Sequence, residues 1–502
     1  GKNIIWERDE FHTYSNNIVI SSNSSLTIKS KVYFKNNSKI IVEPGAKLIL
    51  DGCTLTSACD GFWRGIEVWG NASKPQLPPY QGIVQLMHGA VIENADEAIY
   101  AIKKNPDNSY DWSKTGGIIN AGYAVFRNNK NGVWLGGYRN FIPNNNVTIN
   151  NRSYIHNCTF EITDAYNTNN GMPYAFVGLC GVDGISINGN IFQNTNTTMS
   201  PYEKGRGIVS YDASFFADKL NIFKNLYYSV YAQNISTVKV ADISNNIFEN
   251  NVYGIVLNKV NYASILKNKL VISDNVSNIA GIYLDNCTGY RIEENTINNV
   301  YHGIIINNSG GANNLIYKNF FNNNFISCKA QGINEWHSYD GKGISGLEFK
   351  CNQSESEVCD FAVTSGGIKI RQGYCSSDIT APTGNIFSNN TTYHLYKNLS
   401  AENFTYFGHN NLMPDANRCS SGINLFPCSV SCSDLSKCCP SKIGTGAIDD
   451  NTSWLRVKSI DDDIKKRDKL IAKIDNNKTQ TLLGKINNPF ISMDVLKKEL
   501  LS

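Results

Sequence analysis

Short apolar runs alternate with polar bends over most of this chain. In the stretch "SNNIFENNVYGIVLNKV" from Ser244, the large apolar residues Phe248, Ile255 and Leu257 stand among asparagines. Runs of three to five alternating residues bounded by Asn or Gly predict short β-strands. Helical repeats need longer runs with a 3.6-residue period, which this region lacks. The pattern therefore predicts an all-β fold.

Two signatures recur with one period. An asparagine followed by apolar residues starts "NIFQN" (Asn190), "NIFKN" (Asn221), "NIFEN" (Asn246), "NKLVI" (Asn268), "NTINN" (Asn295), "NFFNN" (Asn319) and "NIFSN" (Asn385). From Asn221 to Asn319 the steps are 25, 22, 27 and 24 residues. A glycine before an alternating strand starts "GIVS" (Gly207), "GIVL" (Gly254), "GIYL" (Gly281) and "GIII" (Gly303), with "SVYA" (Ser229) in one repeat. Two independent markers with the same spacing indicate a solenoid.

A period of two dozen residues fits a right-handed parallel β-helix, in which each coil supplies the connection between parallel strands. Leucine-rich repeats share this length, but their leucine lattice is missing. We expect Ile247, Phe248, Ile255 and Leu257 to point into the coil and stack on their equivalents. Asn and Gly suit bends that need left-handed backbone, and asparagines on successive coils can form a ladder of amide hydrogen bonds.

The chain divides into three segments on this basis. Residues 1–24 are expected to form an N-terminal cap, because an open solenoid end exposes unpaired strands. Residues 25–445 are expected to form the β-helix with Cys-rich final layers, with 104–116 as a loop that leaves the coil. In 446–502, apolar residues at helical spacing predict a short α-helical segment. We expect the natural protein to continue beyond Ser502.

Composition narrows the classes of partner. Charged residues make up 18% of the chain and the net charge is +3, while about one residue in seven is asparagine. Without a Lys/Arg stripe the chain lacks the electrostatic basis for nucleic-acid binding. No run of about 18 apolar residues is present, so no membrane span is expected. Nothing in the sequence indicates a cofactor.

The placement of the 14 cysteines favours disulfides and an oxidising compartment. Cys53 and Cys59 are six residues apart, and Cys351 and Cys359 are eight apart. The residues expected in disulfides are Cys53, Cys59, Cys351, Cys359, Cys419, Cys428, Cys432 and Cys438. The rival is a zinc site at Cys428, Cys432, Cys438 and Cys439. Adjacent cysteines seldom both ligate one tetrahedral ion and no His is nearby in sequence, so no metal site is predicted.

The run "GAKLILDGCTLTSACDGFWRGIEVWG" (Gly45–Gly70) resembles the opening of large surface proteins of Bacteroidota. The match lies in "EPGAKLILDGCTLTS", the Cys53/Cys59 pair and the element from Trp63 to Gly70; "INNPFISMDVLKKELLS" resembles their helical tail. The resemblance implies a right-handed β-helix exported through the type IX secretion machinery to the cell surface. It also implies a loose link to adhesion, gliding motility or glycan handling.

Parallel β-helices often carry polysaccharide lyases or glycosidases, but fold does not establish function. An inverting glycosidase needs two spaced carboxylates, and a lyase needs a basic residue near acidic calcium ligands. The candidates on neighbouring coils are Arg206, Asp212, Asp285, Arg291, Glu293, Glu294 and His302. No "DD" or "DxD" pair occurs in a repeat strand, and "RIEEN" is typical of a solvated face. No catalytic residue is therefore assigned.

Aromatic residues suggest a milder activity, because sugar rings stack on exposed aromatic faces. Trp112 and Tyr110 in the polar loop "NSYDWSK" are the candidates for glycan contact, whereas Trp63 and Trp134 are expected to be interior. Three hypotheses remain. The favoured one is a non-catalytic surface adhesin or glycan-binding module; a polysaccharide lyase or glycoside hydrolase, and a spacer without a ligand, are the alternatives.

Overall fold

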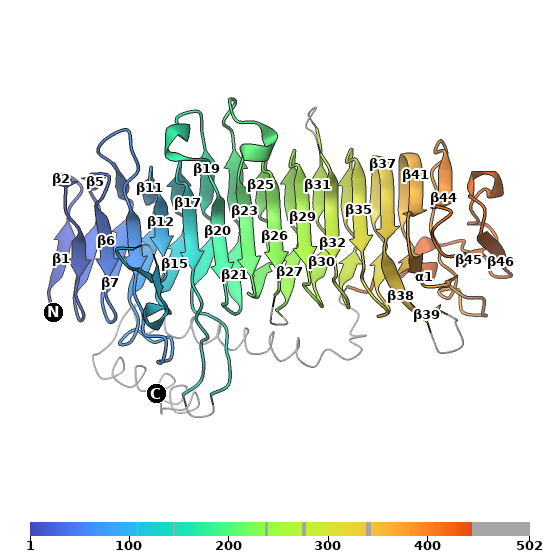
Figure 1. Cartoon of the computed structure of the whole chain (residues 1–502), viewed down its shortest axis with the longest axis horizontal. Coiled ribbons are helices and arrows are strands. Elements are labelled where there is room, and N and C mark those ends of the chain that lie inside the picture. Colours follow the sequence, from blue (N-terminus) through green and yellow to red (C-terminus); the bar gives the residue numbers. More distant parts are fainter. Residues whose placement is uncertain (108, 144–145, 236–238, 274–277, 338–342, 444–502) are drawn as a thin grey trace.

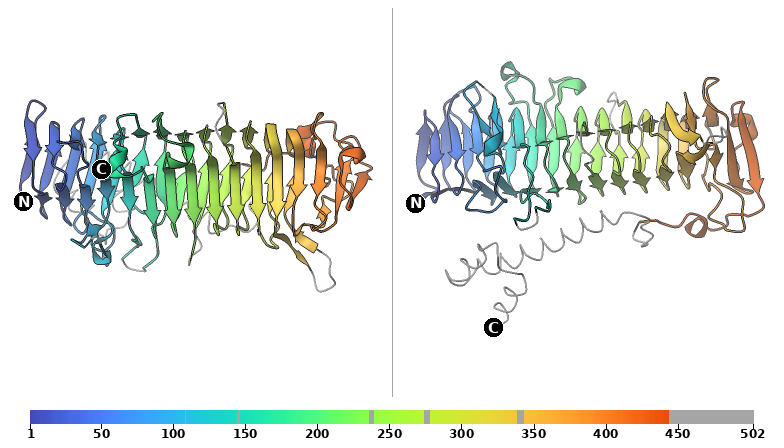
Figure 2. Two further views of the ribbon diagram at one scale, coloured as in Figure 1. Left: turned by 45° about the horizontal axis from the view of Figure 1, so that its top comes forward. Right: turned by 60° about the horizontal axis from the view of Figure 1, so that its bottom comes forward.

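A computed structural model describes residues 1–107, 109–143, 146–235, 239–273, 278–337 and 343–443. Most coils contribute three short strands, and each strand pairs in parallel with its equivalent on the next coil (Figure 1). The coils stack into one elongated prism that stays straight in both further views (Figure 2). The chain is therefore a right-handed parallel β-helix, as the repeat predicts.

Three faces run along the prism. The first face contains β1 (Asn3–Trp6), β4 (Ser25–Ile28), β7 (Lys47–Asp51), β10 (Ile83–Met87), β15 (Ile118–Gly122), β18 (Tyr154–His156), β21 (Ile185–Asn188), β24 (Phe215–Ala217), β27 (Ala241–Ser244), β30 (Ser264–Leu266), β33 (Arg291–Glu293), β36 (Leu315–Tyr317) and β40 (Glu348–Lys350). The second face contains β2 (Phe11–Tyr14), β5 (Lys31–Phe34), β8 (Thr54–Ser57), β11 (Val91–Glu93), β16 (Val125–Arg127), β19 (Thr159–Ile162), β22 (Ile191–Asn194), β25 (Ile222–Lys224), β28 (Ile247–Glu249), β31 (Lys269–Val271) and β34 (Thr296–Asn298). The third face contains β3 (Ile18–Ile20), β6 (Lys39–Val42), β9 (Gly65–Val68), β12 (Glu97–Tyr100), β17 (Asn131–Leu135), β20 (Ala175–Cys180), β23 (Arg206–Tyr211), β26 (Tyr228–Gln233), β29 (Tyr253–Asn258), β32 (Ala280–Asp285) and β35 (His302–Asn307).

The last coils change this pattern. The long strands β37 (Phe320–Gln331) and β41 (Gln353–Val363) run through the corner that separates the second face from the third, and β44 (Tyr393–Lys397) pairs with β41. Smaller elements leave the prism or close its end: β13 (Lys103–Lys104), β14 (Tyr110–Asp111), η1 (Trp112–Lys114), η2 (Thr168–Asn170), η3 (Pro201–Glu203), β38 (Ile333–His337), β39 (Gly343–Gly346), β42 (Gly367–Ile368), β43 (Arg371–Gln372), β45 (Phe404–His409), η4 (Ala416–Arg418), β46 (Ile423–Cys428) and α1 (Leu435–Cys438).

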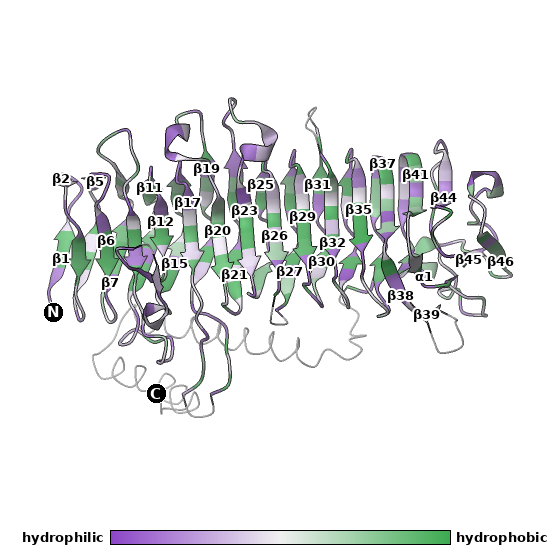
Figure 3. Cartoon of the chain, viewed as in Figure 1, coloured by the Kyte–Doolittle hydropathy of each residue, from purple (hydrophilic) through white to green (hydrophobic). Residues whose placement is uncertain are grey.

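The interior is filled by one continuous hydrophobic core. On the second face, successive coils place phenylalanines in register, and their rings stack with centroids 4.5–5.0 Å apart: Phe126, Phe160, Phe192, Phe223 and Phe248. Ile255 and Leu257 are buried in the same core, as predicted. The alternation of apolar and polar residues along the strands is visible in Figure 3. Burial of such side chains in every coil is the main stabilising term of the solenoid.

The predicted asparagine ladder is present at a buried corner. It contains Asn190, Asn221, Asn246, Asn268, Asn295, Asn319, Asn352 and Asn385. Each backbone N–H donates to the side-chain oxygen of the ladder asparagine on the next coil, at 2.9–3.0 Å. Each side-chain N–H group also donates to a backbone carbonyl, so the corner is satisfied without water.

The ladder asparagines are not the residues with left-handed backbone. The residue immediately before each has positive φ, and it is often not glycine: Leu220, Asn245, Lys267, Glu294, Lys318 and Cys351. The hydrogen bonds of the ladder hold this geometry in every coil. The asparagines therefore serve chiefly as hydrogen-bonding groups, and the turn itself tolerates several residue types.

The segment expected to cap the N-terminus is itself a coil. Within residues 1–24, β1, β2 and β3 pair in parallel with β4, β5 and β6. The loop predicted at 104–116 leaves the prism as a short hairpin of β13 and β14 followed by η1. The predicted helical segment 446–502 lies outside the described residues.

Disulfides are present, and Cys351, Cys428, Cys432 and Cys438 take part in them as expected, but the pairs Cys53/Cys59 and Cys351/Cys359 do not form. The bonds are Cys351–Cys439, Cys375–Cys428 and Cys432–Cys438. The expected participants Cys53, Cys59, Cys359 and Cys419 are free thiols. Cys53 occupies in an early coil the buried corner that Asn190 occupies later, and Cys59 is exposed beyond β8, so the two point apart. Cys359 is buried on β41, away from the corner that holds Cys351.

Candidate functional site

A line of aromatic side chains follows the outer side of the third face. Strand alternation points side chains outward, and register repeats some of these outward positions on successive coils, as for Tyr100 and Trp134 or for Arg206, Tyr228 and Tyr253. We call this set the aromatic track: Tyr100, Tyr110, Trp112, Trp134, Tyr174, Arg206, Tyr211, Tyr228, Tyr231 and Tyr253. It crosses six successive strands from β12 to β29. Five steps of about 4.8 Å between strands give it a length of about 24 Å.

The hairpin supplies the exposed beginning of the track. Tyr110 packs against Tyr100, with ring centroids 5.8 Å apart and the two hydroxyls 2.9 Å apart. Trp112 meets Tyr110 edge to face at 5.9 Å, and 55% of its surface is exposed. The two residues predicted as glycan contacts therefore lie together, at one end of a larger aromatic surface. The buried Trp63 is in the core, as expected.

In the middle of the track, Gly178 leaves room for the Trp134 ring. Tyr100 stacks on Trp134 of the next coil at 6.0 Å, with 7° between the ring planes. The Trp134 indole then lies across Gly178 of the following coil, where an added Cβ would collide with the ring. Trp134 is thus part of the track and only half-buried, which corrects its predicted interior position. Tyr174 continues the line, 6.2 Å from Trp134.

The cationic side chain of Arg206 lies between Tyr174 and Tyr228 of the track. The Arg206 guanidinium lies 4.6 Å from the Tyr174 ring centre and 5.6 Å from that of Tyr228. Arg206, Tyr228 and Tyr253 are in register on successive strands. Tyr228 stacks on Tyr253 with centroids 4.9 Å apart. The side chains therefore present alternating π-faces and one positive charge along the coil axis.

A row of polar side chains borders the track. Tyr211, Gln233, Asn258, Asp285 and Asn307 occupy one register position on successive strands. The Asp285 carboxylate accepts from the side-chain amides of Asn258 at 3.2 Å and Asn307 at 2.6 Å. A tyrosine hydroxyl is protonated at neutral pH and can donate; burial raises the pKa of Tyr211 and Tyr228 further. This edge offers amide and hydroxyl groups suited to sugar hydroxyls.

A charged pocket of ≈ 250 Å³ lies beside the start of the track, between the coils of β6, β9 and β12 and the hairpin. Glu67 pairs with Lys39 at 2.5 Å and Glu97 pairs with Lys104 at 2.9 Å. Burial raises the pKa of Glu97, partly offset by Lys104. The pocket brings together the buried Glu67 and the partly buried Glu97, and the repeat signatures gave no sign of it, because they start at Asn190.

The acidic and basic residues considered from the sequence do not converge. Arg291 pairs with Glu293 within β33 on the first face, at 2.9 Å. Asp285 and Arg206 lie on the third face. His302 contacts the Ile279 carbonyl at 3.2 Å through Nδ1, and burial lowers the pKa of its imidazole. No catalytic pair forms among these residues.

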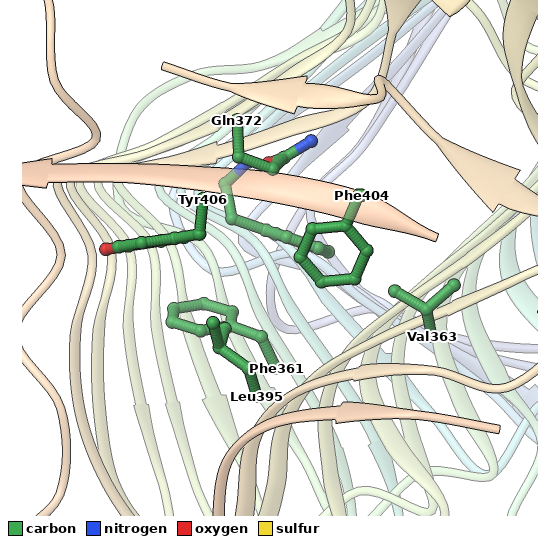
Figure 4. A pocket seen from close by; sticks show the side chains of 7 residues that line it. Phe361, Val363, Gln372, Leu395, Phe404 and Tyr406 are labelled. Atoms are coloured by element: carbon green, nitrogen blue, oxygen red, sulfur yellow. The ribbon is translucent and has the colours of Figure 1, made fainter. Parts of the chain in front are cut away.

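One apolar space of ≈ 10 Å³, about enough for one water molecule, lies in the last coils between Phe361, Leu395, Phe404 and Tyr406 (Figure 4). The described helices include none long and apolar enough to cross a membrane.

Two of three comparisons with known proteins give a match. The model of the family "NosD: Periplasmic copper-binding protein (NosD)" matches residues 156–350. No curated protein matches significantly. Among solved structures, a mutant of the periplasmic alginate epimerase AlgG is 14% identical, with 80% of this chain and 78% of that chain covered and a TM-score of 0.26. The lidless DFA-IIIase of Arthrobacter chlorophenolicus A6 is 13% identical, with 76% and 88% covered and a TM-score of 0.25.

The described residues of the matched part offer no set of ligands for the copper that the family description names. Within the described part of 156–350, no three His, Cys, Asp or Glu side chains come close enough to hold one ion. Cys158, Cys287 and Cys328 are buried singly in the core. The one group of this kind among the described residues lies at the far end of the solenoid, in His409, Cys432 and Cys438.

Proposed function

We propose that this protein is an exported, non-catalytic β-helix that binds a linear polysaccharide along the aromatic track. The observation that carries the proposal is the continuity of the track over six coils. Stacked aromatic faces with a border of amides and hydroxyls match the alternating apolar and polar surfaces of sugar rings. The rigid coil fixes the spacing, so little ordering cost is incurred on binding.

Three disulfides support residence in an oxidising compartment. The periplasmic description of the family that matches 156–350 points the same way. Passage through the type IX secretion machinery and attachment at the cell surface, with a role in adhesion or gliding, rest on the resemblance in Gly45–Gly70. Cell fractionation of a host with and without this machinery tests that part separately.

The central experiment is calorimetric titration with soluble linear polysaccharides, neutral and acidic, and with their monosaccharides. We expect binding to the polymers and none to the monosaccharides, because several coils must be engaged together. The same mixtures are assayed for new reducing ends and for unsaturated products. Absence of binding to every polymer would reject the proposal.

The alternative of a glycoside hydrolase has one supporting observation, the pocket that holds Glu67 and Glu97 next to the track. A raised pKa is typical of a general acid, but both carboxylates are paired with lysines. If the assay detects turnover that Glu97→Gln abolishes, the protein is an enzyme and the non-catalytic proposal is wrong.

A further inference from the structure

At the end of the solenoid, the buried imidazole of His409 lies beside the Cys432–Cys438 disulfide. His409 ends β45 and is 0% exposed. A ring nitrogen of His409 and the sulfur atoms of Cys432 and Cys438 lie within 4.8 Å of one another. The sequence spacing gave no sign of this histidine, because strand pairing brings it to the cysteines.

The protonation of His409 follows from its contacts. Its Nε2 lies 2.8 Å from the carbonyl oxygen of Ile379, which can only accept, so Nε2 carries the proton. In the neutral ring, Nδ1 then holds a free lone pair. Nδ1 is buried and has no hydrogen-bond partner. A histidine whose second nitrogen is fixed by a carbonyl is the usual arrangement of a metal ligand.

The two cysteines are positioned independently of their bond to each other. The Asn411 side chain holds Cys432 from both sides, accepting from its N–H at 2.8 Å and donating to its carbonyl at 2.7 Å. Cys438 ends α1, which begins at a side-chain cap from Asp434. The Cα atoms are 5.8 Å apart. Reduction therefore leaves both sulfurs close to a ring nitrogen of His409.

We propose that His409, Cys432 and Cys438 form a redox-gated site for Cu(I). A dithiol reductant transfers two electrons and two protons to the Cys432–Cys438 bond and is itself oxidised to a disulfide. Cu(I) then displaces the two thiol protons into solvent, and Nδ1 donates its lone pair. In the oxidised protein the sulfurs are bonded to each other and the site is closed.

The ligand set decides the metal class. Two thiolates and one imidazole are soft donors that favour Cu(I) or Zn²⁺. Structural zinc takes four protein ligands and catalytic zinc keeps a water, whereas these three donors are buried. The sulfurs of Cys351 and Cys439 lie next to Gly384 and the His409 ring and are bonded to each other. A three-coordinate Cu(I) site fits what is present.

The test is copper retention against a chromophoric Cu(I) chelator, without oxygen, before and after treatment with a dithiol reductant. We expect the reduced protein to hold one more equivalent of copper than the reduced Cys432→Ser/Cys438→Ser variant. That variant keeps all other thiols, so it subtracts copper bound elsewhere. The reduced Cys375→Ser/Cys428→Ser variant is the matched control and should keep the extra equivalent.

X-ray absorption of the copper-loaded wild type should show two sulfur atoms and one nitrogen. His409→Asn should lose that nitrogen and weaken binding by more than about 10-fold. Equal copper retention by the wild type and the Cys432→Ser/Cys438→Ser variant would overturn the site. The absence of a nitrogen scatterer in the wild type would overturn the role of His409 even if the variant failed to fold. Full retention by the oxidised wild type would overturn the gate.

Discussion

Tyr228 and Tyr253 stack on adjacent coils with ring centroids 4.9 Å apart and ring planes 15° apart. Register places them one above the other on the outer side of the third face. Their neighbours extend the same surface toward Arg206 on one side and Tyr227 on the other. Because the rings are held by the backbone, the surface exists before any ligand binds.

Removal of one ring should weaken polysaccharide binding without unfolding the coil. For Tyr228→Ala we expect a loss of about 5- to 10-fold in affinity, corresponding to about 1–1.4 kcal/mol of stacking energy. Calorimetric titration measures it. Tyr301→Ala, which removes an exposed tyrosine outside the track, is the matched control and should bind like the wild type. Equal losses in the two variants would contradict the assignment.

Interruption of the asparagine ladder should destabilise the protein. Asn246 accepts from the backbone N–H and the side-chain amide of Asn221, at 3.0 and 2.9 Å. Asn246→Ala leaves the buried Asn221 N–H without its acceptor and removes one of the two bonds of the Asn221 amide, which keeps the Ile187 carbonyl; this should lower the free energy of unfolding by about 2–4 kcal/mol. Urea denaturation gives the value. The exposed Asn390→Ala should change it by less than about 0.5 kcal/mol; a similar loss there would count against the ladder.

The phenylalanine stack should be as sensitive. Phe223 is fully buried between Phe192 and Phe248. Phe223→Ala creates a cavity in the stack and should cost about 3–5 kcal/mol, with a smaller loss for Phe223→Leu. Phe11→Ala, at a side chain that is 73% exposed, provides the comparison by thermal or urea unfolding. A loss for Phe223→Ala no greater than that for Phe11→Ala would show that the stack contributes little.

One buried carboxyl should make stability depend on pH. Burial raises the pKa of Asp360 from 3.8 to about 6, although the Ser388 N–H and hydroxyl donate to it. Between about pH 4 and 6 the folded protein keeps a proton that the unfolded chain releases. Stability from this residue is therefore greatest below pH 4 and falls by up to about 3 kcal/mol as the pH rises to 6.

Asp360→Asn removes the titrating carboxyl. It should therefore reduce the change in the free energy of unfolding between about pH 4 and pH 6. The free energies of unfolding of the wild type and the variant are measured with urea near pH 4 and near pH 7. The difference between the two proteins is then compared at the two pH values. We expect the variant to gain relative to the wild type at the higher pH. An unchanged difference would mean that the carboxyl titrates normally in the folded protein.

The number of free thiols distinguishes the observed disulfides from the local pairs. The three disulfides use six of the 14 cysteines, and eight thiols remain free. Titration of denatured, unreduced protein should therefore give eight thiols, and 14 after reduction. Mass mapping should find Cys53 and Cys59 unlinked. A Cys53–Cys59 peptide would contradict the burial of Cys53.

The sequence by itself determined the β-helix, the phase of its coils and the asparagine ladder. Those properties are local and periodic: each coil repeats the same apolar and amide positions, so neighbours 22 to 27 residues apart must stack. The ladder member Asn352, which the asparagine signature did not include, stands 33 residues from both Asn319 and Asn385, so these last coils are longer than the repeat. The resemblance in Gly45–Gly70 added an expectation about export, which is independent of that pattern.

Only the tertiary structure decided the disulfide partners, the aromatic track and the group around His409. Cys351 bonds to Cys439 across 88 residues, whereas Cys53 is buried at a corner of the coil, Cys59 is exposed, and both are free thiols. The tyrosines of the track recur beside the glycine signature, but which side of the strand faces water depends on the register. Contacts between distant segments depend on how irregular layers close the solenoid, and no repeat in the sequence encodes that closure.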